Sequence, residues 1–359
     1  MKRILILSRD GKENRMLFAL PALLNLGLNV DIFTENPFAL RNLPPYILNK
    51  IKVFSISCKS ASPKSVYLRL ISEWIKMKRL KDLVNDYDII LNVRIRNLYD
   101  PLLSSRAKVI YALYDPMINH RHSYRTRYAP LMKLYFALLD NIFLNRCKRA
   151  VILANSYYTQ RVLADNNIVS HVIYPPCKTA DLHSSQRKST QVVSVARISI
   201  EKRHEDTLRI ARHFRNIKFI ILGELKDAAY YRRLIELKTP NVDIVAPTHN
   251  QFRKLLRKYL AESKIYLHLA DDEPFGITIV EAMASGCIPI VRNAAGPREI
   301  VTSESGFKWD SICEAIKYIS KILSNEELRQ KLSSNVVERA KKFSPEAYQK
   351  SLIEIIQKL

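Results

Sequence analysis

Short apolar runs alternate with amphipathic stretches along the whole chain of 359 residues. An apolar run of about four to eight residues predicts a buried strand, whereas apolar positions that recur every three or four residues predict a helix. Near the N-terminus, Arg3–Leu7 and Asn29–Thr34 predict strands, and Met16–Leu26 predicts a helix between them. This strand–helix–strand order is that of a doubly wound α/β domain with a parallel sheet.

The same alternation continues to the C-terminus. Further strands are predicted for Lys52–Ser57, Asp88–Val93, Lys108–Leu113, Ala150–Asn155, His171–Tyr174, Gln191–Ala196, Lys218–Leu222, Val242–Val245, Ile265–Leu269 and Cys287–Val291. Further helices are predicted for Ser65–Asn85, Ser156–Leu163, Glu205–Phe214, Gln251–Ser263, Ile277–Ser285, Ser311–Ile322, Glu326–Lys341 and Pro345–Lys358. The polar stretch Ala180–Ser189 is expected to be exposed.

The chain is predicted to divide near its middle. Its length corresponds to two domains of ordinary size. Pro175 and Pro176 stiffen the backbone between the last strand of the first set and the first strand of the second set. We therefore expect residues 1–175 to form one Rossmann-like domain and residues 176–344 to form another.

Composition excludes several classes of protein. There is no run of about 18 uncharged apolar residues, so no membrane span is expected. The apolar run at the N-terminus is too short for a signal peptide. Five widely spaced cysteines without a CxxC pair indicate a reduced, cytoplasmic protein without a structural zinc. His120 and His122 lie close together, but no third metal ligand accompanies them, and no metal or other cofactor is expected.

The net charge of +24 is distributed unevenly. Residues 1–180 hold 28 Lys and Arg against 12 Asp and Glu, a net +16, whereas residues 181–359 hold 30 against 22, a net +8. This excess predicts an anionic partner for the first half, either a membrane surface, a lipid phosphate or nucleic acid. The predicted helix Ser65–Asn85 is basic and amphipathic, so it either lies on an anionic membrane or packs on the sheet with a solvated basic face.

Glycine is scarce, and four of the seven glycines lie between Gly276 and Gly306. Glycine is required where a backbone turns tightly or approaches a ligand, so this clustering indicates a site. The region predicts a strand, a loop, a helix and a strand, and the backbone N–H groups of Phe275–Thr278 at the helix start form an anion site. Glu273 precedes this helix and Glu281 lies within it, so both carboxylates can border one cleft.

The pattern EPFGIxxxEAMAxGxxPxV, which begins at Glu273, closely resembles the nucleotide-sugar signature of retaining glycosyltransferases of family 4. Members have the GT-B fold, in which two doubly wound Rossmann-like domains face a cleft. Asn293–Pro297, NAAGP, resembles the members that extend dolichol-linked oligosaccharides with mannose. The resemblance implies that residues 176–344 bind the nucleotide-sugar and residues 1–175 the acceptor. It also implies that the last helix, residues 345–359, packs back on the first domain.

The resemblance assigns roles to particular residues. Arg197 and Lys202 resemble the Arg and Lys that clamp the donor diphosphate, where positive charge would stabilise the leaving group. Glu273 would bind the sugar hydroxyls, and Glu281 would accept hydrogen bonds from the ribose hydroxyls. The substrate-binding set also includes the amide-bearing residues Phe275, Gly276, Ile277 and Thr278, together with Gly223 at the end of another strand.

The chain departs from the family pattern at several positions. Members carry a glycine pair in the first loop, where this chain has Gly11 alone. Ala196 and Arg203 stand where glycines are common. Members often place a functional histidine just after the strand equivalent to Lys108–Leu113, and either Asp115 or His120 takes that place here.

The resemblance implies the transfer of a hexose by a retaining mechanism, with mannose as the first choice of sugar. The donor would be GDP-mannose or a UDP-sugar, and the acceptor a glycan or a polyisoprenyl-linked molecule at an anionic membrane that the protein contacts peripherally. One alternative is a catalytically idle GT-B scaffold of a membrane glycosylation complex. Another is a basic nucleic-acid-binding protein, although no basic helix-turn-helix or aromatic stacking motif favours it.

Overall fold

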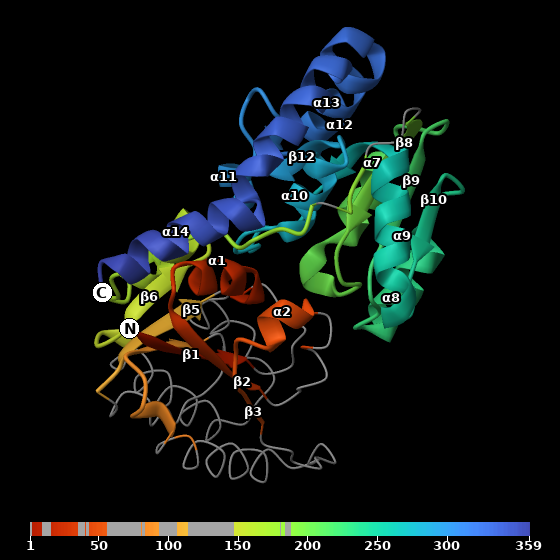
Figure 1. Cartoon of the computed structure of the whole chain (residues 1–359). Coiled ribbons are helices and arrows are strands. Elements are labelled where there is room, and N and C mark those ends of the chain that lie inside the picture. The colour runs from red at the N-terminus through yellow and green to blue at the C-terminus, as the bar shows by residue number, and fades with distance from the viewer. Residues whose placement is uncertain are drawn as a thin grey trace. The chain divides into compact units, whose positions relative to one another are not determined.

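The chain folds into two compact units, each built on a parallel β-sheet (Figure 1). The structure is a computed structural model that describes residues 2–8, 16–34, 40, 43–55, 80, 83–92, 106–113, 147–179, 181–183 and 188–359. Unit 1 contains Met1–Pro175 and Tyr348–Leu359, and unit 2 contains Pro176–Ala347. None of the helices within these ranges is long and apolar enough to span a bilayer.

The sheet of unit 1 has seven strands among the described residues, in the order β3-β2-β1-β4-β5-β6-β7. All six neighbouring pairs are parallel. The strands are β1 Arg3–Ser8, β2 Asn29–Thr34, β3 Val53–Ser55, β4 Ile89–Asn92, β5 Lys108–Leu113, β6 Val151–Ala154 and β7 His171–Val172. The chain winds outward from β1 in both directions, which is the doubly wound arrangement that the sequence predicted.

Both faces of this sheet are covered, as a parallel sheet requires. Successive side chains of a strand point to opposite faces. Accordingly, Ile4 and Ile6 belong to one buried cluster, and Leu5 and Leu7 belong to the other. Helix α14, Pro345–Gln357, packs its apolar stripe against the first of these faces. That stripe repeats every four residues and consists of Tyr348, Leu352 and Ile356.

The remaining helices of unit 1 are short in the described ranges. They are η1 Met16–Ala19, α1 Leu20–Asn25, α2 Pro45–Leu48 and α6 Tyr157–Ala164. The helix predicted for Met16–Leu26 is therefore a 3-10 turn followed by an α-helix, because Pro21 has no N–H and starts a new helix. Most of the predicted basic helix Ser65–Asn85 lies outside the described residues.

The sheet of unit 2 has six strands, in the order β10-β9-β8-β11-β12-β13, and is also parallel throughout. The strands are β8 Ser189–Val195, β9 Lys218–Leu222, β10 Val242–Val245, β11 Ser263–Leu267, β12 Ile288–Arg292 and β13 Phe307–Trp309. The sequence did not predict β13, which has only three residues and therefore little periodicity. Its Trp309 nevertheless fills the end of the core.

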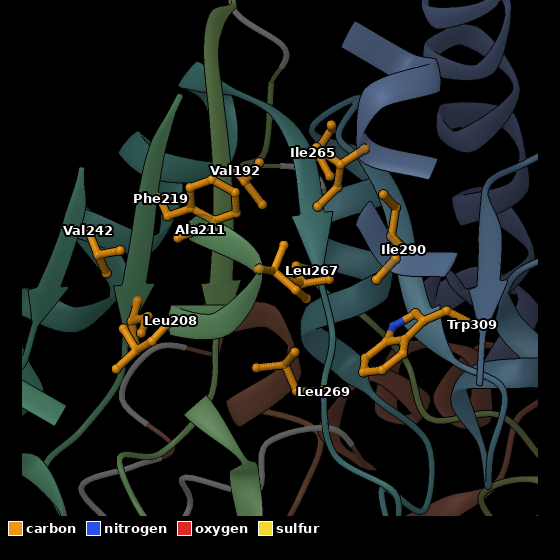
Figure 2. Packing of buried hydrophobic residues seen from close by; sticks show 14 of the residues in the cluster. Val192, Leu208, Ala211, Phe219, Val242, Ile265, Leu267, Leu269, Ile290 and Trp309 are labelled. Carbon is orange, nitrogen blue, oxygen red and sulfur yellow. The ribbon is translucent and has the colours of Figure 1, made fainter. Parts of the chain in front are cut away.

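Each strand of unit 2 contributes an apolar side chain to one core (Figure 2). The strands are bridged on this face by Leu208 and Ala211 of helix α7, His204–Ala211. Figure 2 labels the strand residues Val192, Phe219, Val242, Ile265, Leu267, Ile290 and Trp309. The near-continuous burial of these strands explains why all of them except β13 were predicted from a short apolar run.

Unit 2 also contains a helix that the sequence did not predict. Helix α8, Ala228–Leu237, is capped by Asp227, whose carboxylate accepts hydrogen bonds from the backbone N–H groups of Ala229 and Tyr230 at 3.0 Å. The capping aspartate was the available signal. The other helical elements are η5 Ile200–Lys202, α9 His249–Glu262, α10 Ile277–Ala284, α11 Pro297–Ile300, α12 Ile312–Ser324, α13 Glu326–Ala340 and η6 Lys341–Phe343.

The prediction that Ala180–Ser189 is exposed was wrong for Leu182, which is buried, and for Lys188. Its ammonium donates hydrogen bonds to the carbonyls of Leu260 and Ala261 at 3.0 and 3.1 Å, and to that of Ser263 at 2.8 Å. These carbonyls lie at the C-terminal end of α9, where carbonyl groups lack partners within the helix. Lys188 therefore caps α9 and complements the negative end of its dipole.

Candidate active site

The loops after β8 and β11 lie at the point where the winding of the unit 2 sheet reverses. From β8 the chain adds β9 and β10 on one side, and it adds β11, β12 and β13 on the other. In an open parallel sheet, this switch point at the carboxyl ends of the strands is where ligands bind. Most residues that the sequence predicted to act on the donor lie in these two loops and at the start of α10, whereas Gly223 follows β9 and Glu281 lies in the second turn of α10.

The loop after β8 is held against β9 by a close backbone contact. A side chain at Gly223 would place its Cβ 1.8 Å from the carbonyl oxygen of Ala196, so only glycine fits. The N–H of Ile198 also donates a hydrogen bond to the carbonyl of Glu224 at 2.9 Å. Gly223, which was predicted to bind substrate, thus has a structural reason for being glycine.

The loop after β11 carries Glu273 and is supported by a second glycine. The N–H of Gly296 donates a hydrogen bond to the carbonyl of Glu273 at 3.0 Å. A Cβ at Gly296 would lie 2.2 Å from the carbonyl oxygen of Pro274. The side chain of Phe275 is buried, and its ring packs edge-on against that of Phe343, with 5.5 Å between the ring centroids. Only the backbone of Phe275 is therefore suited to bind a ligand.

Lys202 and Glu273 form an ion pair across the two loops, with 2.8 Å between Nζ and Oε2. Both side chains are largely buried, at 14% and 26% exposure. Burial opposes ionisation of Glu273, but the charge of Lys202, with that of Arg197 a smaller contribution, lowers the pKa of its carboxyl below the ordinary value. The site thus keeps a charged carboxylate within reach of an ammonium.

The pair lies at the start of α10. Gly276, the N-cap, has a left-handed backbone with φ of +105°, which a side chain would strain. A Cβ built there would lie 3.6 Å from Cγ of Glu273. Lys202 and Glu273 are therefore next to the helix end where backbone N–H groups and the helix dipole favour an anion.

Arg197 lies in the loop after β8, where its side chain is exposed. Its guanidinium is 3.8 Å from the carboxylate of Glu201, and both side chains are more than half exposed. Such an exposed pair contributes about 0–1 kcal/mol, so its rearrangement around a ligand costs little. The carbonyl of Arg197 accepts a hydrogen bond from the ring of the buried His204 at 3.0 Å, which fixes the backbone at this point.

Tyr266 of β11 and Thr278 in the first turn of α10 hold these two elements together. Their hydroxyl oxygens are 2.7 Å apart. Burial raises the pKa of Tyr266, and the negative charges of Glu273 and Glu281 raise it further. The two carboxylates come from the loop before α10 and from the second turn of that helix.

Glu281 is buried and forms an ion pair with Arg253 of α9. The apolar positions Ile277, Val280, Met283 and Ala284 predict one buried stripe on this helix, and Val280 and Met283 are buried, but Ile277 and Ala284 are only half-buried. Ile279 and Ala282 are fully buried instead. The prediction failed because α10 packs against both α13 and the sheet and so buries more than one stripe.

Solved structures with similar folds cover the whole chain. Anabaena HepE in complex with UDP and glucose matches with a TM-score of 0.75 at 17% identity, and both chains are covered completely. Sucrose-phosphate synthase from Thermosynechococcus elongatus matches with a TM-score of 0.74 at 14% identity, over 100% of this chain and 99% of the other. The fold is GT-B.

The family model matches within unit 2 of this GT-B chain. Residues 178–339 match the family model described as Glycosyl transferases group 1. The GT-B chain is also 25% identical over 212 residues to the Dictyostelium discoideum protein named GDP-Man:Man(3)GlcNAc(2)-PP-Dol alpha-1,2-mannosyltransferase, which covers 52% of this chain and 42% of that protein. The Homo sapiens protein of the same name is 25% identical over 256 residues, 63% of this chain and 52% of that protein. The chain thus spans about half the length of these relatives.

Sequence reasoning missed a second charge network beside the site of this GT-B chain. Asp271 binds Arg292 of β12 at 2.6 Å and also pairs with Arg203. Arg203 has a left-handed backbone with φ of +56°. Glycine adopts this conformation without strain, whereas here ion pairs to Asp206 and Asp271 accompany an arginine in it.

His268 is the other residue at this site that was not predicted. It follows β11 directly and is 5% exposed, and its Nδ1 has no hydrogen-bond partner among the described residues. Burial lowers its pKa to about 4, although the negative charge of Glu273 opposes this shift. The imidazole is therefore neutral at ordinary pH.

Two of the predicted site residues, Asp115 and His120, lie outside the described residues. Within the parts of the chain that the structure describes, no group of three or more His, Cys, Asp or Glu side chains is arranged to hold a metal ion.

Proposed function

We propose that this chain is a retaining glycosyltransferase that moves a hexose, mannose in first place, from a nucleotide-diphospho-sugar to a glycan or lipid-linked acceptor. The observation that carries the proposal is the Lys202–Glu273 pair at the start of α10, within a region that matches the Glycosyl transferases group 1 model. This arrangement combines a cation, a carboxylate and a helix N-terminus, which are the groups needed to bind a sugar linked to a diphosphate.

In this proposal, catalysis depends mainly on stabilising the diphosphate as it leaves. Arg197, Lys202 and the first backbone N–H groups of α10 supply the positive charge. An ammonium has three N–H donors, so Lys202 can keep its bond to Glu273 and still donate to a phosphate oxygen. One such preorganised donor is worth about 3 kcal/mol of barrier. The scheme invokes no metal ion, so transfer should be insensitive to EDTA.

The two carboxylates would hold the two ends of the donor. Glu273, next to Lys202, would accept hydrogen bonds from the sugar hydroxyls. Glu281 would accept hydrogen bonds from the ribose hydroxyls of the nucleotide. Their places along α10 support this division, because Glu273 precedes the helix start that would bind the diphosphate and Glu281 lies in the second turn.

GDP-mannose is the first choice of donor. The curated relatives carry GDP-Man in their names, and the NAAGP stretch at Asn293–Pro297 resembles the mannosyl-transferring members of family 4. A UDP-sugar is the alternative, because the solved complex of HepE contains UDP and glucose.

We also propose a polyisoprenyl-linked acceptor, in keeping with the names of the relatives, and peripheral contact with an anionic membrane on its cytoplasmic side. The net +16 charge of residues 1–180 supports such contact.

Hydrolysis of a panel of nucleotide-sugars tests the activity and the donor together. Release of GDP from GDP-mannose, accelerated by a lipid-linked oligosaccharide, is the expected result. Release of UDP from a UDP-sugar alone would correct the donor. If no donor is consumed with any acceptor, the chain is the catalytically idle scaffold and the proposal fails.

A sedimentation assay tests the membrane contact. The chain should bind vesicles that contain anionic lipid and lose binding as salt is raised. Binding to duplex DNA but not to these vesicles would instead favour the nucleic-acid-binding alternative.

A further inference from the structure

Arg253 joins two segments that are far apart in the sequence. Its Nη1 forms the ion pair with Glu281 of α10, and its Nη2 donates a hydrogen bond to the carbonyl of Lys178 at 3.2 Å. Lys178 follows the proline pair where unit 2 begins. The guanidinium is therefore held at two points, one on a helix and one on the backbone.

The contact between Arg253 and Glu281 matters because the carboxylate of Glu281 is buried. The side chain of Glu281 is 9% exposed, and a buried carboxylate must be paired with a cation to stay charged at low cost. Arginine suits this position because its planar fork can donate in two directions, whereas lysine is a flexible point charge. The contact sets the direction in which the carboxylate points.

We infer that Arg253 is a positioning residue that orients Glu281 for the ribose hydroxyls of the donor nucleotide. The inference rests on the proposed role of Glu281 as the ribose ligand. A carboxylate offers about four acceptor positions, so Glu281 can accept from Arg253 and from a ribose hydroxyl at the same time. Arg253 then determines how strongly the site prefers a ribonucleotide to one without ribose hydroxyls.

Arg257 provides a matched control one turn further along α9. It pairs with Asp181, in the same segment as Lys178, and is about as exposed as Arg253, at 46% against 35%. Replacing either arginine by methionine removes an ion pair and a link from α9 to this segment. Of the two replacements, that of Arg253 removes an ion-pair partner of Glu281, and that of Arg257 does not.

The test measures, by calorimetry, the ratio of the affinity for a ribonucleotide to the affinity for its analogue without ribose hydroxyls. GDP and UDP are each compared with their 2′,3′-dideoxy analogues, using wild type, Arg253→Met, Arg253→Lys and Arg257→Met. Hydrogen bonds to a charged group are worth about 1.5–3 kcal/mol, so the wild type should prefer the ribonucleotide by about tenfold or more. Arg253→Met should lower this ratio to about threefold or less, and Arg253→Lys to an intermediate value. Arg257→Met should keep the wild-type ratio.

The ratio distinguishes positioning from general stability, because a merely structural loss weakens both ligands equally. A wild-type ratio in Arg253→Met overturns the inference and leaves the proposed function standing. If that variant does not fold, an unchanged ratio in Arg253→Lys overturns it in the same way. If the wild type binds each dideoxy analogue as tightly as GDP or UDP itself, Glu281 does not bind the ribose hydroxyls, and this inference fails as well. A wild type that binds no nucleotide overturns the proposed function itself.

Discussion

The ammonium of Lys202 lies 2.8 Å from the carboxylate of Glu273, although 71 residues separate them in the chain. The contact ties the loop after β8 to the loop after β11 at the point where the sheet reverses its winding. Breaking a largely buried pair by removing one partner leaves the other charge uncompensated. The same two side chains are those that the proposed reaction uses, so stability and activity can be compared by replacing each of them conservatively.

Glu273→Gln should abolish most of the transfer activity and leave the fold intact. The amide carbonyl can still accept a hydrogen bond from Lys202, so the free energy of unfolding should fall by only about 1–2 kcal/mol. Loss of the charged group that orients the sugar should reduce the rate by about 100-fold or more. Initial rates and denaturant unfolding measure the two effects. Glu201→Gln, which alters an exposed pair with Arg197 and a hydrogen bond from Ser199, should keep the wild-type rate. Near-normal turnover by Glu273→Gln would contradict the role assigned to it.

Replacing Arg197 and Lys202 together by alanine should weaken binding of the nucleoside diphosphate by at least about tenfold. Both charges would face the diphosphate, and a charge-assisted hydrogen bond contributes about 1.5–3 kcal/mol. Calorimetry with the nucleotide released in the hydrolysis assay measures the change. The paired control is Lys218→Ala with Lys264→Ala, since these lysines lie at or near the amino ends of β9 and β11. Equal affinities of the two double variants would rule out the clamp.

Gly296→Ala should damage activity beyond its effect on stability. The new Cβ would lie 2.2 Å from the carbonyl oxygen of Pro274 and 2.6 Å from Cα of Phe275, so the loop that carries Glu273 must move. Gly306→Ala creates a comparable clash, 2.4 Å from the carbonyl oxygen of Pro289, but away from that loop. Both variants should lose about 1–3 kcal/mol of stability. Initial rates at a temperature where both are folded should fall steeply only for Gly296→Ala. Similar rates for the two would show that the loop tolerates the displacement.

His268 should make the stability of the protein fall as the pH drops from 6.5 towards 4. The imidazole takes up a proton near pH 6.5 when exposed, but burial lowers its pKa to about 4 in the folded chain. The unfolded state therefore binds more protons in this window, and the stability present above pH 6.5 is progressively lost. One pKa unit corresponds to about 1.36 kcal/mol, so the loss should reach about 2 kcal/mol by pH 5.

Denaturant unfolding of wild type and His268→Phe between pH 7 and pH 5 checks this expectation. The variant cannot titrate at this position, so its stability should depend less on pH. His204 is also buried, and burial lowers its pKa too, so a His204→Phe double variant should flatten the curve further. If His268→Phe follows the wild-type curve throughout, the imidazole is not buried in solution.

The strands other than β13 could be predicted from the sequence because they follow local patterns, whereas Lys202 and Glu273 were placed at one site by the family resemblance and not by a predicted contact. Short apolar runs become buried strands, and the order of the strands brings their carboxyl ends together. The partners of the charged groups could not be predicted. Arg253 meets Glu281, and Arg203 meets Asp271, through side chains whose directions depend on packing between α9, α10 and β12. Likewise, the buried face of α10 follows from its contact with α13 rather than from its own period.

The contact between Phe275 and Phe343 has a practical consequence for producing unit 2 as a fragment. Phe343 covers Phe275, and its carbonyl accepts a hydrogen bond from the N–H of Cys177 at 2.9 Å. A fragment designed on the family match alone would stop at residue 339 and omit this cover. It would also begin at residue 178 and lack Cys177, and it would leave the ring of Phe275 without this cover close to Glu273. Expression boundaries at Pro176 and Ala347 retain both contacts.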